Sequence, residues 1–249
     1  MSATCPCGSR LKLQDCCVSK DIAVLKREAV VDLASPEKID RAITYIKYKA
    51  NHNKRIIAEQ KIYAESIGKE ITCKKGCSAC CAQFIAARLE ECDAIVIYLY
   101  LYPELMNRFL KKYDDWHEKI TSGDNILKKI SRTYQKVLKT SLPEDKKRFE
   151  LLALEYARKH ALCPFLNNDE CIIYPVRPYT CSTYTIISDK KYCDPNLPEE
   201  EYIKNKLKIK PDKNPLYCET EYFAGFKKRF TLGPLQTLVY HILKGNHEK

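Results

Sequence analysis

Glycine is scarce in this chain, which has only 7 among its 249 residues. Enzymes that bind nucleotides hold the phosphates in glycine-rich loops, and the sequence contains neither such a loop nor a Rossmann fingerprint. It also shows no nucleophile with an obvious partner base. The sequence therefore offers no independent support for catalysis, and whether the protein is an enzyme stays open.

Long hydrophobic runs are also missing. The longest, Ala94–Tyr102, is far shorter than the roughly 20 residues that are needed to span a bilayer. The first residues lack the basic segment and the following apolar segment of a secretory signal peptide. We therefore expect a cytoplasmic protein without a membrane partner, whose cysteines stay reduced.

The remaining composition is typical of a helical globular protein. Hydrophobic residues make up 45% and charged residues 30%, and Lys, Glu, Leu and Ile recur in long runs. This composition predicts a mainly α-helical fold. The formal net charge of +11 could attract nucleic acid, ribosomes or acidic proteins. Because the lysines are spread over many segments, a solvated helical surface explains them better, and nucleic acid is not an expected partner.

Cysteine is the residue that the chain has in plenty, with 14 copies. In a cytoplasmic protein, clustered thiols usually bind metal rather than form disulfides. The first group lies near the N-terminus, where Cys5 and Cys7 are followed by Cys16 and Cys17. So short a segment cannot build a hydrophobic core. Zinc could fold it, because structural zinc contributes roughly 10–16 kcal/mol of apparent binding free energy in peptides of this size.

Residues 1–19 resemble the SEC-C motif, a zinc knuckle that also occurs in the SecA translocation ATPase. The resemblance is carried by CPCGS followed by a CC pair, with Arg10 where a second glycine is common. It implies a Zn²⁺ ion held by four cysteines, namely Cys5, Cys7, Cys16 and Cys17. The knuckle also suggests a protein or ribosome partner.

Residues 20–70 are predicted to be helical, first as a short helix and then as a long one. Ser35, Pro36 and Glu37 supply a cap, a proline at the first helical position and an acid in the first turn. Gly68 is expected to end the long helix. Its predicted apolar face repeats every seven residues and consists of Ile43, Ala50, Ile57 and Ala64, with Ile39, Ile46 and Ile67 beside them.

A second group of cysteines lies in CKKGCSACC, residues 73–81, and a third group follows about eighty residues later. We expect the two groups to meet in space and to hold a metal ion or an iron–sulfur cluster, because thiolates are soft donors that suit such centres. The candidate ligands are Cys73, Cys77, Cys80, Cys81, Cys163, Cys171 and Cys181. The segment 73–81 could be helical, or Gly76 could make a tight loop. Adjacent Cys80 and Cys81 tend to point apart, so one of them could serve a second metal or support a ligand.

The expected metal-binding domain spans residues 71–249. Its central helix should begin at Leu89 and end at Pro103, with Cys92 as a packed core thiol. Another helix should follow Pro103, and the last helix, residues 234–244, should dock on the same core.

Two further helix starts are predicted from caps. Asp124 is the expected N-cap of one helix, and Ser141 with Glu144 forms the expected capping box of the next. The histidines His117 and His160 are expected at the surface rather than as ligands. Cys193 and Cys218 match no motif and are not expected ligands, although either could supply an extra thiolate.

Residues 71–185 are similar to the YkgJ-like family of zinc- or iron-chelating proteins. Both halves of the family pattern, CKKGCSACC and CPFL…CIIYPVRPYTC, are present in order. The resemblance implies that the seven central thiols are metal ligands. Arg177 also matches, and it could form either charge-assisted hydrogen bonds near the thiolates or a structural salt bridge. Ser182 stands where the family usually has arginine, so no anion-binding role carries over to it.

Seven thiols exceed the needs of one tetrahedral zinc ion or one cuboidal iron–sulfur cluster, each of which uses four. We therefore expect either one cluster with spare thiols or two metals, with Zn²⁺ or iron–sulfur as the cofactor. The first hypothesis for the function is a metal-binding protein without catalysis of its own. The second is an iron–sulfur enzyme for redox chemistry or protein lysine methyl transfer, because flagellin lysine methylases carry a related cysteine pattern. The third is a ribosome- or translocation-associated adaptor.

Overall fold

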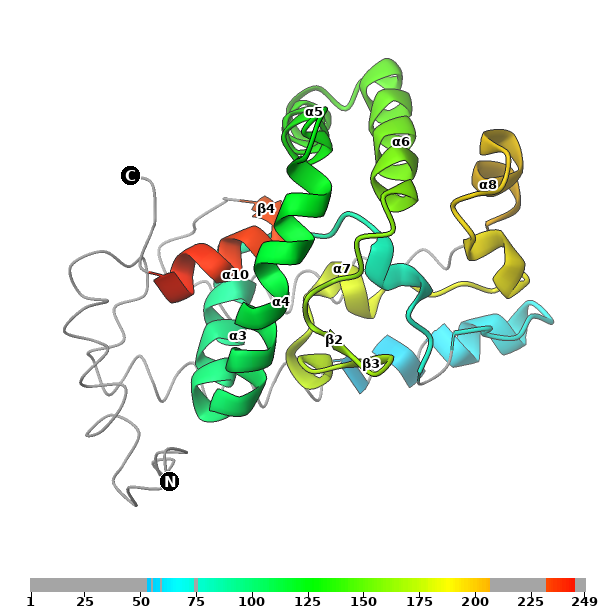
Figure 1. The fold of residues 1–249 in the computed structure, drawn as a ribbon. Coiled ribbons are helices and arrows are strands. Elements are labelled where there is room, and N and C mark those ends of the chain that lie inside the picture. Colours follow the sequence, from blue (N-terminus) through cyan, green and yellow to red (C-terminus); the bar gives the residue numbers. More distant parts are fainter. Residues whose placement is uncertain (1–52, 55, 59, 74–75, 207–231, 245–249) are drawn as a thin grey trace.

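The computed structural model describes residues 53–54, 56–58, 60–73, 76–206 and 232–244, and Figure 1 shows how they are arranged. They form a mainly helical structure, which confirms the predicted fold class. The expected zinc knuckle at residues 1–19, the first part of the long helix and Cys218 lie outside the described residues.

The centre of the core is helix α3, Leu89–Leu101, as the sequence predicts. Most of its side chains are buried, and both Cys92 and Ile95 are 0% exposed, so Cys92 is the core thiol that was expected. Helix α10, Leu235–Lys244, packs against α3 and buries Val239 between them. The predicted docking of the last helix on the core is therefore confirmed.

A short antiparallel ribbon holds α10 beside α3. Strand β1, Ala86–Arg88, pairs with β4, Leu232–Pro234, and places Ala87 opposite Gly233. The Leu235 N–H continues this contact by donating to the Ile85 carbonyl at 2.9 Å. The ribbon thereby joins the last described segment of the chain to the segment that follows the CC pair of the central cysteine group.

Three long helices follow α3, and α5 and α6 stand side by side as a hairpin (Figure 1). They are α4, Pro103–Thr121; α5, Ile126–Thr140; and α6, Pro143–Arg158. Proline at the first position fits the start of α4 and of α6, because that position needs no backbone N–H donor. The buried face of α4 consists of Phe109, Tyr113, Trp116 and Ile120, whose spacing is that of one helical stripe.

The cap of α5 differs from the prediction by one residue. The side chain of Asn125, not that of Asp124, accepts the hydrogen bond from the Lys128 N–H, at 3.0 Å. Asp124 instead forms an ion pair with Lys129. Asp and Asn suit the N-cap about equally, so the sequence alone does not separate two adjacent candidates.

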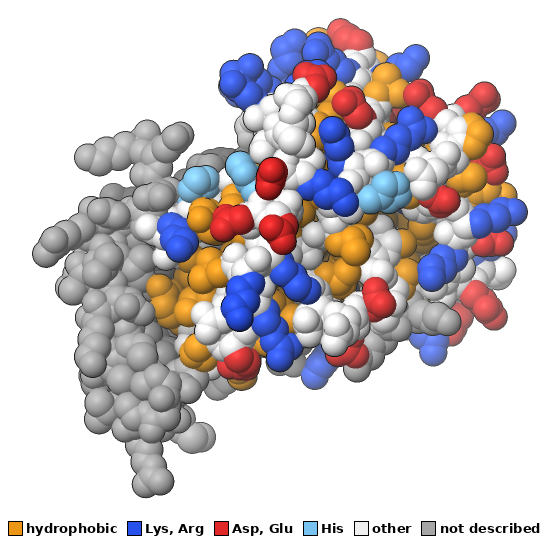
Figure 2. Space-filling view, viewed as in Figure 1, with side chains coloured by type: hydrophobic (Ala, Val, Ile, Leu, Met, Phe, Trp, Pro, Cys, Tyr) orange, Lys and Arg blue, Asp and Glu red, His pale blue; other side chains and the backbone are white. Residues whose placement is uncertain are grey.

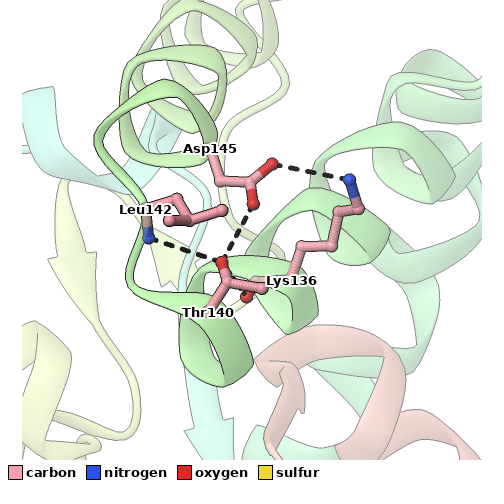
Figure 3. Close-up of polar contacts among 4 residues, drawn as sticks. All are labelled: Lys136, Thr140, Leu142 and Asp145. Carbon is pink, nitrogen blue, oxygen red and sulfur yellow. Dashed lines mark hydrogen bonds and ion pairs between the residues drawn. The ribbon is translucent and has the colours of Figure 1, made fainter.

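The predicted capping box of Ser141 and Glu144 is wrong. Ser141 ends α5 with a left-handed φ of 53°, and Leu142 precedes α6 without a side-chain cap. The tie between the two helices comes from Thr140, whose hydroxyl donates to Asp145 Oδ2 at 2.9 Å (Figure 3). Lys136 Nζ lies 3.7 Å from the other Asp145 oxygen. Asp145 is thereby held in place although it is buried.

Residues 53–66, apart from 55 and 59, form a helix, and the chain turns at Gly68, whose φ is 64°. The end of the long helix is therefore as predicted. Its described apolar face is not, since Ile57 and Ile67 are 36% and 44% exposed. Only Ala64 of the predicted heptad positions in this part is buried.

The buried stripe of this helix is half polar, since Asn53 and Gln60 are buried beside Ile56 and Ala64. Asn53 donates to the carbonyls of Pro175 and Arg177, at 3.1 and 3.3 Å. Gln60 donates to the Thr183 carbonyl at 3.2 Å and accepts from the Thr185 hydroxyl at 2.6 Å. The helix docks through these amides onto an irregular segment whose backbone needs hydrogen-bond partners. An apolar face could not supply them.

The irregular segments carry the cysteines. The hairpin of β2, Leu166–Asn167, and β3, Glu170–Cys171, turns through two residues with positive φ. The remaining short elements are η2, Ala79–Ala82; η3, Tyr174–Val176; α7, Tyr179–Ser182; η4, Lys190–Cys193; and α8, Glu199–Asn205.

The surface is strongly basic at one end. Figure 2 shows Lys and Arg side chains gathered where α5 and α6 stand. Lysines and arginines of these helices line a hollow there, namely Lys128, Lys129, Arg132, Lys136 and Arg148. Within the described ranges, no helix is both long and apolar enough to cross a membrane.

Candidate metal centre

The two central cysteine groups lie side by side. The Cys163 N–H donates to the Cys81 carbonyl at 2.8 Å. Cys81 belongs to η2, and Cys163 follows the end of α6 after a turn in which His160 has a φ of 49°. The chain thus brings the groups together as the spacing suggests, and their role as ligands stays a prediction.

Cys73 is placed by a second backbone contact. The Thr72 N–H donates to the Ile186 carbonyl at 3.1 Å, and the Ile186 N–H donates to Cys73 Sγ at 3.3 Å. The chain then turns at Gly76, whose φ of 81° favours glycine. Apart from residues 74–75, segment 73–81 is therefore a loop that leads into η2. Of the two predicted conformations, a helix and a tight loop at Gly76, the loop is the correct one.

Eight cysteines line one cavity of about 500 Å³. They are the seven predicted thiols and one more, namely Cys73, Cys77, Cys80, Cys81, Cys163, Cys171, Cys181 and Cys193. The nine described cysteines, including Cys92 in the core, form no disulfide with one another. In the part of the chain that the structure describes, no three His, Cys, Asp or Glu side chains already converge as in a preformed metal site. The thiols form the wall of a cavity rather than a closed coordination shell.

Apolar side chains and two cations also line the cavity, together with the acidic residues Asp169 and Glu170. The apolar residues are Ile71, Ile85, Phe165, Leu166, Ile173, Ile186 and Leu235. The Arg177 guanidinium lies 4.1 Å above the Tyr174 ring, and its buried Nε has no hydrogen-bond partner among the described residues. Lys206, only 8% exposed, lies with its Nζ 4.0 Å from the centre of the Tyr202 ring. Both cations face a lining of thiols.

Hydrogen-bond donors already point at the deeply buried sulfur of Cys163. Gln236, 2% exposed on α10, donates from Nε2 to Cys163 Sγ at 3.2 Å. Burial raises the pKa of Cys163 to about 11, while Gln236 and the Phe165 N–H oppose that rise. Donors to sulfur stabilise the thiolate, which is the form that binds metal.

Burial also raises the pKa of the neighbouring thiols. It raises the pKa of Cys171 to about 12, and the charge of Cys163 adds to this effect. The pKa of Cys181 lies well above its usual range, first because of burial and then because of charge on Cys171 and Cys163. Without a cation in the cavity these sulfurs therefore stay protonated at neutral pH.

Cys80 behaves in the opposite way. Its pKa is lowered to about 7, first by a hydrogen bond from Cys81 and then, against the effect of burial, by the positive charge of Arg177. The same hydrogen bond and burial raise the pKa of Cys81. Cys80 therefore becomes a thiolate more readily than its buried neighbours Cys163 and Cys171.

The residues that line the cavity fit a soft metal. Thiolate sulfur is the preferred donor of Zn²⁺, Cu(I) and iron–sulfur clusters, and eight such donors face one space. A volume near 500 Å³ exceeds by far the roughly 30 Å³ share of one water molecule, so more than one ion can enter. The Arg177 Nε–H, buried without a partner among described residues, suits an anionic thiolate–metal centre.

Two residues of this site were not expected. Cys193 lies in η4 and follows no cysteine motif, and Gln236 is a lone amide on a helix far along the sequence. Ser182, by contrast, is 2% exposed and donates its hydroxyl to backbone carbonyls. The histidines lie elsewhere, since His117 stacks on Tyr113 and His160 contacts Asn196 at 3.2 Å.

Comparison with known proteins identifies one motif. The profile of the SEC-C motif family matches residues 1–17. No curated protein and no solved structure matches the chain. The match supports metal-binding cysteines at the start of the chain. It covers none of the residues that line the central cavity.

Proposed function

We propose that the protein is a metal-binding protein that holds Zn²⁺ or an iron–sulfur cluster in its central thiol cavity. The observation that carries this proposal is the lining of one cavity by eight cysteines from five separate stretches of chain. A single buried thiol such as Cys92 is an ordinary core residue, but eight thiols on the wall of one cavity are typical of a metal site. The similarity of residues 71–185 to the YkgJ-like family supports the same function.

Metal binding at these cysteines exchanges thiol protons for a metal cation. Each thiol must lose its proton to become a ligand, so binding releases protons to solvent. The mostly apolar wall makes unpaired thiolates costly and a thiolate–metal centre favourable. Arg177 and Lys206 then offset the remaining negative charge of the centre, and Gln236 orients the Cys163 sulfur.

The second metal of the proposal is a Zn²⁺ ion at the N-terminal knuckle. The SEC-C match to residues 1–17 supports it, with Cys5, Cys7, Cys16 and Cys17 as the ligands. A protein or ribosome partner of this knuckle, and the division of the chain at residues 19 and 70, stay predictions. Co-sedimentation of the protein with ribosomes at several salt concentrations tests the partner.

Purification of the full chain without oxygen tests the proposal. Iron, zinc and acid-labile sulfide are measured together with the visible spectrum. Iron with sulfide and a brown colour would identify a cluster and favour the redox or methyl-transfer enzyme. Zinc without visible absorbance would identify a zinc protein without redox chemistry. A protein whose metal content does not exceed the one ion of the knuckle would refute the proposal for the cavity.

A further inference from the structure

We propose that the basic hollow at α5 and α6 is a docking surface for the phosphate backbone of a nucleic-acid duplex. The hollow and the thiol cavity have no lining residue in common, so this surface does not depend on the metal-binding function. From the sequence, nucleic acid is not an expected partner, because the lysines are spread over many segments. The fold nevertheless concentrates part of them at one place, as Figure 2 shows.

The cations of α5 share one face of the helix. Its 15 residues include five Lys or Arg and no Asp or Glu, namely Lys128, Lys129, Arg132, Lys136 and Lys139. At about 3.6 residues per turn, all five fall within an arc of about 100°. A solvated helix face usually mixes both signs of charge, and like charges four residues apart destabilise a helix. A face that carries cations alone therefore indicates an anionic partner rather than a contribution to stability.

This face borders a concave surface. The hollow has a volume of about 450 Å³, and all of the α5 cations except Lys139 line it. Helix α6 adds Arg148 to the lining. Among the described residues that line the hollow, Asp124 is the single acid, and it forms an ion pair with Lys129. Two helices thus contribute cations to one hollow that a narrow, negatively charged ridge can enter.

Most of this positive charge is not neutralised by the described part of the chain. Lys128, Arg132 and Arg148 are exposed, and none of them forms an ion pair with a described residue. Lys136 lies 3.7 Å from Asp145, but its side chain is 66% exposed and so stays accessible to a partner. An anion in the hollow therefore gains at least three cations that have no competing carboxylate.

The kind of side chain in the lining favours a duplex over other anionic partners. No apolar or aromatic side chain is among the described residues that line the hollow. Protein interfaces bury apolar and aromatic anchors at their centre, and membrane-binding helices combine basic with apolar side chains. Single strands bind by stacking their bases on aromatic rings. A duplex covers its bases and presents phosphates on the outside, so cations alone suffice to bind it.

The length of the basic face suits several phosphates of one strand. From Lys128 to Lys136, α5 advances by about 12 Å. One strand of a DNA duplex carries a phosphate for every 3.4 Å or so of axis, so this length covers about three or four of them. Arg132 and Arg148 can each bind a phosphate through two parallel N–H donors. Because such contacts reach phosphates and not base edges, binding should be independent of base sequence.

Fluorescence anisotropy of the full chain with labelled DNA and RNA duplexes tests this docking surface. We expect duplex binding whose affinity falls steeply between about 50 and 200 mM salt, because it releases counterions. Arg132→Gln combined with Arg148→Gln should weaken binding roughly 10–100-fold and reduce the slope of log affinity against log salt by about two. Both side chains are exposed, so the substitutions should leave the fold intact by circular dichroism.

Arg108→Gln combined with Lys111→Gln is the matched control. It removes the same charge from exposed positions of α4 that do not line the hollow, so it should weaken binding far less. Equal losses in the two double variants would assign binding to net charge and overturn the docking surface. Unchanged binding after the substitutions in the hollow, or no duplex binding by the native chain, would also overturn it. So would equally tight binding of polyglutamate or of vesicles that contain phosphatidylserine, which would indicate an acidic protein or a membrane instead.

Discussion

At the scale of single residues, the cavity is distinguished by what points at its sulfurs. Gln236 donates to Cys163, and Ile186 donates to Cys73. A protonated thiol is a weak acceptor, whereas a thiolate is a strong one. Donors placed on buried sulfurs therefore indicate a wall arranged for the ionised form.

Replacing Gln236 with leucine should weaken metal binding. The substitution keeps a similar volume but removes the donor to Cys163 Sγ. Loss of a group that orients a metal ligand typically costs 10–100-fold, so we expect roughly that decrease in zinc affinity. Competition with a chromophoric chelator measures it. Leu238→Met on the same helix is the control and should leave the affinity unchanged.

The metal-free protein should lose stability as the pH rises above about 8.5, the usual pKa of an unfolded cysteine. Folding raises the pKa of Cys163 to about 11 and that of Cys171 to about 12, so the native state keeps protons that the unfolded chain releases. Their contribution is complete below pH 8.5 and is lost as the pH rises through the folded values. The lowered pKa of Cys80, about 7, has the opposite effect on stability. Its contribution to the free energy of unfolding increases as the pH rises from about 7 to about 8.5.

Urea unfolding at pH 7.5, 8.5 and 9.5 measures this dependence. The highest of these pH values lies below the usual tyrosine pKa of about 10, so most tyrosines stay protonated. A variant with serine at Cys163 and Cys171 should show a flatter profile, and zinc-loaded protein should show no such decline, because its thiols carry no proton. An equally steep decline in the serine variant would assign the effect to other groups.

Sequence patterns pointed to seven cavity thiols and named Cys193 only as a possible extra thiolate, and they gave no sign of Gln236. The seven stand in two dense groups, and density is visible in a sequence. Cys193 lines the cavity from η4, and Gln236 reaches the Cys163 sulfur from α10, which the β1–β4 ribbon precedes. Contacts of this kind depend on tertiary packing, and no local spacing encodes them.

At the scale of elements, the helix over residues 53–66 is attached by polar contacts. Replacing Gln60 with alanine would leave the Thr183 carbonyl and the Thr185 hydroxyl without their partner. Each buried unsatisfied group costs about 1–3 kcal/mol, so we expect a loss of that order in the free energy of unfolding. Ile62→Ala, 66% exposed on the same helix, should change it by less than about 0.5 kcal/mol. Chemical denaturation compares the two.

The α5–α6 hairpin offers a second element-scale prediction. Asp145, 7% exposed, accepts from Thr140, so Asp145→Ala should lower the free energy of unfolding by about 1–3 kcal/mol. Lys136 also faces this carboxylate, but its side chain is 66% exposed. Lys136→Ala should therefore cost under about 1 kcal/mol. Equal effects of the two substitutions would show that the ion pair, not the buried hydrogen bond, ties the helices.

The order of the helices could be predicted from the sequence. The buried face of residues 53–66 and the caps of α5 and α6 were predicted wrongly. Pro103 and the apolar run before it set α3 and α4 correctly. The predicted face of residues 53–66 was wrong because the heptad pattern chose Ile57, whereas the buried stripe runs through Ile56. Asn53 and Gln60 lie on the same stripe and bond the backbone around Pro175 and Thr183, which an apolar pattern cannot reveal.

At the scale of the whole molecule, a helical body surrounds a cavity wall made of short irregular pieces. The wall segments make few regular backbone hydrogen bonds, so their order depends on contacts across the cavity. A metal that joins sulfurs from several of these segments would stabilise the native state by linkage, since the unfolded chain offers no such site. Metal binding should therefore raise the free energy of unfolding, and removal of the metal should lower it.

Metal content of the full chain is the most direct test of metal binding in the cavity. The protein is purified with the knuckle disabled by Cys5→Ser and Cys7→Ser, with and without serine at Cys163 and Cys171. Elemental analysis then counts metal per chain, and thermal unfolding is recorded for each sample. We expect the knuckle variant to retain tightly bound metal in the cavity, and the added substitutions to lower both metal content and the unfolding temperature. A knuckle variant without metal, or cavity substitutions that change neither quantity, would contradict the account.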